Sequence, residues 1–219
     1  HSAIGFVILF LSCLSLPAGA DRSGLTQACV LSPDGVSPLE QKAVTVLVEE
    51  VEKRAGIRWR VVSSLPDDGA AWIVAASART LHQLSGRIPD PFANEPAFTA
   101  PEGYRIRLVN DGVRLVVYII GNDDRGVLYG VGHLLRKVDL SPGRIAIADN
   151  FQAATAPRYP LRGHQLGYRP KTNSYDGWPV PMWDQYIRDL ALSGANAIEL
   201  IPPRSDDDAD SPHFTLPPM

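Results

Sequence analysis

The residues best suited to chemistry lie near the carboxyl end of the sequence, where polar side chains alternate with apolar or small ones. Arg162 and His164 lie two residues apart, so we predict that both point to one face of a strand beginning at Leu161. Because burying two such groups without partners costs free energy, we expect them to face the interior of a β-barrel and to bind a ligand there. The sequence leaves one alternative open: an arginine at the rim and a core histidine that the backbone satisfies.

A carboxylate occupies the next predicted strand. In residues 197–201, Glu199 alternates with Ile198 and Leu200, so we expect Glu199 on the barrel interior and the apolar pair against helices. Active sites of such barrels lie at the carboxyl ends of the strands, which makes Glu199 a candidate for ligand binding. An internal ion pair with Arg162 explains the same position equally well.

Two polar loops follow these strands. Tyr168 opens the first, which runs to Trp178, and its aromatic and amide groups suit a sugar, which presents apolar ring faces and many hydroxyls. The second loop, over residues 204–213, is strongly acidic. It lacks the glycine and the terminal glutamate of an EF-hand. We therefore interpret it as a solvated loop or a substrate contact, and we expect neither a metal site nor a cofactor.

The order strand, loop, helix and strand is typical of the first unit of a (β/α)8 barrel, which we predict over residues 161–219. The helix covers residues 181–192 and ends at Gly194. Such a barrel needs roughly 250 residues, whereas about 60 follow Pro157. We therefore expect the front end of a larger enzyme, with its catalytic residues beyond Met219.

An α/β domain is predicted before the barrel, over residues 25–150, and a proline-containing linker over residues 151–160. Apolar segments over 58–62 and 71–75 predict strands, and residues 78–84 predict a short helix. The fold class is therefore α/β, with a mixed sheet and helices that precede the start of the barrel.

Local signals fix two further elements of this domain. A helix begins after Ser37, which forms a capping box with Glu40, and it ends at Gly56. Residues 104–109 and 113–120 flank an Asp-Gly pair, which predicts a β-hairpin. We expect one face of its first strand to be solvated, because arginines alternate there with apolar side chains.

The last helix of this domain begins at Asp123 and contains Gly126, Gly130 and Gly132. Their order, and their place inside the helix, do not fit a dinucleotide-binding loop. Glycine within a helix costs up to about 1 kcal/mol. We expect close packing of the helix on a sheet to compensate.

This helix resembles the closing helix of a small α/β domain that precedes the catalytic barrel in two families of glycosidases. These are the β-N-acetylhexosaminidases of glycoside hydrolase family 20 and the α-glucuronidases of family 67. The resemblance rests on an Arg-Gly-x-x-Tyr-Gly pattern followed by a leucine pair, at Arg125, Gly126, Tyr129, Gly130, Leu134 and Leu135. It implies a supporting domain without catalytic residues.

The segment Tyr159-Pro-Leu-Arg-Gly163 is similar to the first barrel strand of family 20, where an arginine before a glycine holds hydroxyls of the terminal sugar. The resemblance implies that Arg162 binds sugar, a role that suits the fixed fork of guanidinium donors. The chain then departs from both families. Family 20 continues with an aspartate and a second arginine, and family 67 has an asparagine-histidine-tryptophan-aspartate run. This chain continues with His164-Gln-Leu-Gly-Tyr168.

The resemblance implies hydrolysis of a terminal sugar from a polysaccharide or glycoconjugate. An α-glucuronidase-like activity is the first hypothesis and a β-N-acetylhexosaminidase-like activity the second. Either needs a general acid and an oxocarbenium-like transition state. In both families the catalytic carboxylates come from later strands, so no residue of this chain is assigned to catalysis. The alternatives are a carbohydrate-binding protein with a degenerate barrel and another barrel hydrolase with the same first domain.

The amino-terminal 20 residues predict a cleaved signal peptide, because an apolar run over residues 4–16 precedes small residues and Asp21. We expect export to the periplasm or the cell exterior, with no membrane contact after cleavage. A buried core segment and a lipid anchor at Cys13 are the alternatives. The net charge of −3 offers no footprint for nucleic acid, so the expected partner is a carbohydrate.

Overall fold

The structure is a computed structural model that describes residues 22–110, 112, 114–166 and 178–200. A six-stranded sheet with the order β3-β2-β4-β6-β5-β9 forms its centre. β2, β3, β4 and β6 are parallel, and β5 pairs antiparallel with both β6 and β9. The strands are β2 (Cys29–Leu31), β3 (Arg60–Val62), β4 (Trp72–Ser77), β5 (Tyr104–Asn110), β6 (Leu115–Gly121) and β9 (Gln152–Thr155). This mixed sheet confirms the predicted α/β class.

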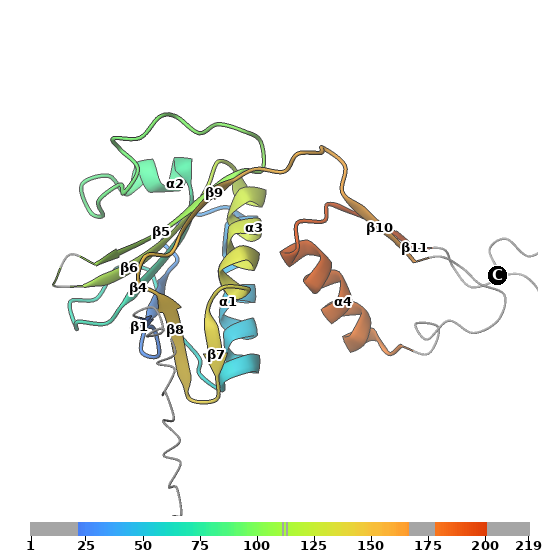
Figure 1. Cartoon of the computed structure of the whole chain (residues 1–219), viewed down its shortest axis with the longest axis horizontal. Coiled ribbons are helices and arrows are strands. Elements are labelled where there is room, and N and C mark those ends of the chain that lie inside the picture. The colour runs from blue at the N-terminus through green and yellow to red at the C-terminus, as the bar shows by residue number, and fades with distance from the viewer. Residues whose placement is uncertain (1–21, 111, 113, 167–177, 201–219) are drawn as a thin grey trace, which may run out of the picture.

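Helices cover both faces of this sheet (Figure 1). α1 (Pro38–Ala55) and α3 (Asp124–Leu135) lie side by side on one face, and α2 (Ala78–Gln83) lies on the other. The central strands β4 and β6 are buried almost throughout, as expected of strands covered on both faces. The main core lies between α1, α3 and the sheet.

Two local predictions are confirmed in detail. The Ser37 hydroxyl accepts a hydrogen bond from the Glu40 amide at 3.1 Å, and the Ser37 amide donates to the Glu40 carboxylate at 3.1 Å. α1 ends at Gly56, which has a φ of 68°. The hairpin also forms as predicted, because β5 and β6 pair antiparallel as far as Asn110 and Leu115.

Two predictions about β5 and its neighbour need correction. The arginine face of β5 is only partly solvated: the side chains of Arg105 and Arg107 are 16% and 28% exposed, and their guanidinium groups lie 4.2 and 4.8 Å from the centre of the Phe92 ring. The loop before β5 supplies this cover. The predicted linker over residues 151–160 contains β9, whose small side chains pair with β5, Ala153 opposite Ile106. Alanines and a threonine carry too little apolar area to stand out as a strand.

A second, three-stranded antiparallel sheet has the order β1-β8-β7. It contains β1 (Arg22–Gly24), β7 (Asp139–Ser141) and β8 (Arg144–Ala148), and no strand was predicted over these residues. Ile145 and Ile147 on β8 are buried in the main core. The two sheets and the three helices together, residues 22–155, are called the accessory unit below.

The remaining elements form one parallel β-α-β unit. β10 (Gly163–Leu166) pairs with β11 (Ala197–Leu200), and α4 (Val180–Leu192) connects them. Figure 1 shows α4 between this pair and α3 of the accessory unit. A single such unit is what the start of a (β/α)8 barrel would contain. The described residues show this unit and not a closed barrel.

The glycines of α3 permit close packing on both sides of the helix. A Cβ added to Gly130 would lie 2.6 Å from Cγ2 of Ile119 on β6, so the predicted approach to a sheet is confirmed there. A Cβ at Gly132 would instead overlap the carbonyl oxygen of Leu192 on α4. α3 is therefore sandwiched between the sheet and α4, a second contact that the sequence pattern did not reveal.

Candidate functional site at the β10–β11 pair

The register of β10 and β11 decides which side chains share a face. Gln165 pairs with Glu199, and His164 pairs with Ile198. Because successive side chains of a strand point to opposite faces, Gln165 and Glu199 lie next to each other on one face. Both residues are exposed. An amide and a carboxylate in this arrangement offer a donor and several acceptors to a polar ligand.

The opposite face of the pair meets α4. The hydroxyl of Tyr186 on α4 is hydrogen-bonded to Nδ1 of His164, and the two rings stack edge to face with centroids 5.8 Å apart. Helices surround a (β/α)8 barrel on its outside. The face that carries Gln165 and Glu199 is therefore the one that would line the interior.

Three aromatic side chains gather at the start of α4. The ring of Trp178 lies 5.3 Å from that of Trp183 and 5.4 Å from that of Tyr186. In the sequence, Trp178 directly follows the loop that leaves the carboxyl end of β10, and a barrel would place its ligand site at that end of the strand. Aromatic rings are suitable contacts for the apolar faces of sugars.

Arg162 lies at the amino end of β10 and contacts the accessory unit. Its guanidinium donates to the Glu102 carboxylate at 2.6 Å and to the carbonyl oxygens of Gly194 and Tyr159, each at 2.7 Å. It also lies 5.3 Å from the centre of the Tyr129 ring. These contacts hold the side chain at the junction between the two parts of the chain.

Two predicted placements are therefore wrong. His164 faces α4 rather than a barrel interior, because it shares the face of Ile198, and Arg162 is directed to the junction. Glu199 lies on the face away from α4, and Gln165, which sequence reasoning overlooked, lies beside it. Pairing the two strands in parallel from their apolar residues would have found this neighbour. Substrate binding by Arg162, His164, Tyr168 and Glu199 stays a prediction.

Three predicted features lie outside the described residues. They are the signal peptide over residues 1–20, Tyr168 with most of its loop, and the acidic segment over residues 204–213. Within the described ranges, His, Cys, Asp and Glu side chains form no group of three that could hold a metal ion. None of the helices in the described part of the chain combines the length and the apolar character that a membrane span requires.

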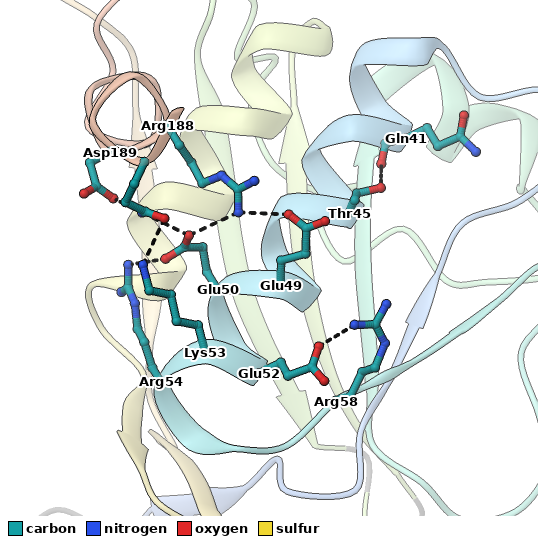
Figure 2. Close-up of polar contacts among 11 residues, drawn as sticks. Gln41, Thr45, Glu49, Glu50, Glu52, Lys53, Arg54, Arg58, Arg188 and Asp189 are labelled. Atoms are coloured by element: carbon teal, nitrogen blue, oxygen red, sulfur yellow. Dashed lines mark hydrogen bonds and ion pairs between the residues drawn. The ribbon is translucent and has the colours of Figure 1, made fainter. Parts of the chain in front are cut away.

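Helix α4, which supports the site from behind, is held by polar contacts to α1. Figure 2 shows Arg188 reaching from α4 to two carboxylates of α1, Glu49 at 2.8 Å and Glu50 at 3.4 Å. Glu50 also accepts a hydrogen bond from the side-chain amide of Gln185 at 3.2 Å. At the carboxyl end of α4, the side chain of Arg136, the C-cap residue of α3, donates to the carbonyl oxygen of Leu192 at 2.7 Å.

Burial would raise the pKa of Glu50, but hydrogen bonds from Gln185, Arg54 and Arg188 outweigh it and hold this pKa below its usual value. Glu102 behaves in the same way, because hydrogen bonds from Arg125 and Arg162 exceed the effect of burial and lower its pKa. Both carboxylates are therefore charged at neutral pH, and both face cations across the boundary of the accessory unit.

No protein-family model and no curated protein matches the sequence. Solved structures of glycoside hydrolases do share its fold. A GH115 4-O-methyl-α-glucuronidase with specificity for decorated arabinogalactans has a TM-score of 0.55 and 14% identity over 82% of this chain. A GH20 exo-β-N-acetylglucosaminidase from Vibrio harveyi has a TM-score of 0.52 and 15% identity over 85% of this chain. A β-hexosaminidase from Streptomyces plicatus has a TM-score of 0.50 and 18% identity over 83%.

The match covers 25%, 24% and 31% of these three neighbours, so the chain spans about a quarter to a third of their length. At such low identity the likeness defines a class of fold: the mixed α/β arrangement found in these glycoside hydrolases. The resemblance stated from the sequence is thereby supported at the level of fold, without choosing one family.

Proposed function

We propose that this chain is the amino-terminal part of a glycoside hydrolase, in which the accessory unit precedes a (β/α)8 catalytic barrel that begins at β10. The observation that carries the proposal is the parallel β10–β11 pair, with Gln165 and Glu199 on the face away from α4. The fold shared with GH115 and GH20 structures supports it independently. The catalytic carboxylates would come from strands that follow β11.

In this proposal Gln165 and Glu199 hold hydroxyl groups of a sugar. The carboxylate accepts hydrogen bonds from two hydroxyls, while the neighbouring amide both donates and accepts. Trp178, which directly follows the loop after β10, would border the sugar, and Trp183 and Tyr186 of α4 would hold its ring in place. Arg162, at the amino end of β10, and His164, on the face toward α4, would support the two strands without facing the sugar. Tyr168 would belong to the loop after β10.

The preferred substrate is a terminal α-linked glucuronic acid, since one structural neighbour is a 4-O-methyl-α-glucuronidase. Hydrolysis of a terminal β-linked N-acetylglucosamine is the second candidate, favoured by the neighbour from Vibrio harveyi. We also propose that the protein is exported, on the strength of the signal-peptide pattern over residues 1–20.

The test is to measure hydrolysis of an aryl α-glucuronide and of an aryl N-acetyl-β-glucosaminide by the full-length protein. Turnover of one of them would assign the activity. Glu199→Gln should then lower kcat/KM about 10- to 100-fold, because a hydrogen bond to a charged group contributes about 1.5 to 3 kcal/mol. Gln165→Ala should lower it less.

Exposed residues of the accessory unit supply matched controls. Glu52→Gln on α1 and Gln152→Ala on β9 make the same chemical changes away from the β10–β11 pair and should leave kcat/KM unchanged. Sugar binding without turnover would favour a carbohydrate-binding protein. Full activity in Glu199→Gln would contradict the site proposed here.

A further inference from the structure

Glu102 has a backbone conformation that is unusual for its residue type. Its φ is 56°, in the left-handed region that residues with a Cβ rarely adopt. Hydrogen bonds hold the turn in place: the Glu102 amide donates to Oδ2 of Asp123 at 2.7 Å, and the Gly103 amide donates to the carbonyl oxygen of Ala100 at 3.0 Å. Non-glycine residues in such sparsely populated backbone conformations cluster at functional sites.

The side chain of Glu102 is placed between two arginines. One carboxylate oxygen accepts from Arg125 of α3 at 2.9 Å, and the other accepts from Arg162 at 2.6 Å. The Glu102 side chain is 14% exposed, and that of Arg162 is 19% exposed. The second bond crosses from the accessory unit to the residue before β10, sixty positions later in the sequence.

The main chain of Arg162 is hydrogen-bonded to residues at the amino end of β11. Its carbonyl oxygen accepts from the amides of Asn196 at 2.8 Å and Ala197 at 3.3 Å, and its own amide donates to Oδ1 of Asn196 at 2.9 Å. Its guanidinium donates to the carbonyl oxygen of Gly194 in the loop between α4 and β11. Any displacement of Arg162 therefore disturbs the amino ends of both strands.

We infer that Glu102 is a positioning residue, which fixes the amino ends of β10 and β11 relative to the six-stranded sheet through Arg162. The segment between β9 and β10 then acts as a rigid connection and not as a hinge. This also explains a glutamate where a glycine would fit the backbone better: only the carboxylate provides the link. The inference concerns the fold and holds whether or not the protein hydrolyses sugars.

The test measures amide hydrogen exchange across the whole chain in Glu102→Gly. Glycine accepts the positive φ, so the turn keeps its shape while the link is lost. The amides of Asn196 and Ala197 should exchange about tenfold faster or more, since a charge-assisted hydrogen bond is removed. The amide of Gly103 and those of β4 and β6 should exchange at the wild-type rate or more slowly.

Glu95→Gly is the matched control. Glu95 lies in the same loop and pairs with Arg105 and Arg107 within the accessory unit, so its loss should leave Asn196 and Ala197 unaffected. Exchange of these two amides within twofold of wild type in Glu102→Gly would overturn the inference. Equal acceleration in β4 and β6 would also overturn it, because Glu102 would then support only general stability.

A double-mutant cycle with Arg162→Gln identifies the partner. If Glu102 acts through Arg162, then Glu102→Gln combined with Arg162→Gln should accelerate exchange at Asn196 and Ala197 no further than the larger single effect. Additive accelerations would mean that the two side chains act separately, and the link through Arg162 would be rejected.

Discussion

The contact between α1 and α4 permits a quantitative prediction, because two adjacent glutamates of α1 share one arginine. Glu50 is 1% exposed and binds Arg54 at 2.8 Å, Gln185 at 3.2 Å and Arg188 at 3.4 Å. Breaking a fully buried ion pair costs about 3 to 5 kcal/mol. Arg54 and Arg188 are 38% and 27% exposed, so water screens them and solvates them when the carboxylate is lost. Glu50→Ala should therefore lower the free energy of unfolding by about 2 to 3 kcal/mol.

Glu49 supplies the control. Its carboxylate lies closer to Arg188, at 2.8 Å, but its side chain is 38% exposed. Exposed pairs contribute about 0 to 1 kcal/mol, so Glu49→Ala should lower the free energy of unfolding by less than about 1 kcal/mol. Equilibrium urea unfolding of the whole chain, followed by circular dichroism and tryptophan fluorescence, measures both values. An equal or larger loss in Glu49→Ala would refute the argument that burial, rather than distance, decides the strength of this contact.

The sign of the pH effect follows from the lowered pKa of Glu50. A carboxyl group whose folded-state pKa is depressed stabilises the protein above its unfolded-state pKa, about 4.3 for glutamate. It loses that contribution as the pH falls through the lower, folded-state pKa. The stability difference between wild type and Glu50→Ala should therefore be constant from pH 7 to about pH 5 and shrink below that. A difference that grows on acidification would contradict the assignment.

Substitutions at three further positions test the packing and the caps. Gly132→Ala should lower the free energy of unfolding by about 1 to 3 kcal/mol in thermal unfolding, because the added Cβ would overlap the Leu192 backbone. Gly24→Ala is the control, since nothing lies within 4 Å of a Cβ at that position, and an equally large loss there would contradict this. Ser37→Ala should cost about 1 kcal/mol and Ser37→Gly only a few tenths, and equal losses would argue against the capping role. Glu40, whose pKa is lowered because backbone amides of Ser77 and Ser37 outweigh burial, stabilises above the ordinary glutamate pKa. Wild type should therefore lose more stability than Glu40→Gln as the pH falls below about 5, and parallel pH curves would refute this.

Signals confined to a few neighbouring residues predicted local structure well. The structure contains the capping box at Ser37, the helix end at Gly56 and the β5–β6 hairpin. Each of these depends on residues that are close together in the sequence. β9 was missed because its stability comes from pairing with β5 rather than from its own small side chains. Whether such a segment forms a strand depends on the strand it pairs with, and a local sequence pattern does not contain that information.

The candidate site shows the same division between local and distant information. Alternation in a strand of four residues separates two faces, but it does not state which face meets a helix. That choice came from the partner strand, where His164 stands beside Ile198, and from Tyr186 on α4. A cost of burial was correctly expected for Arg162, whose side chain is 19% exposed, and the carboxylate of Glu102 from a distant segment meets that cost. His164 is exposed, and its ring is hydrogen-bonded to the hydroxyl of Tyr186.

The contacts of α4 explain how the β10–α4–β11 unit is held against the accessory unit. An isolated pair of four-residue strands is marginal in water. Here the helix behind the pair is fixed to α1 by Glu50, and its carboxyl end contacts Gly132 of α3 and Arg136, the C-cap residue of α3. Glu102 holds the amino ends of the strands from the opposite side of the junction. The accessory unit thus supplies the surface on which α4 packs, and it also holds the amino end of the β10–β11 pair.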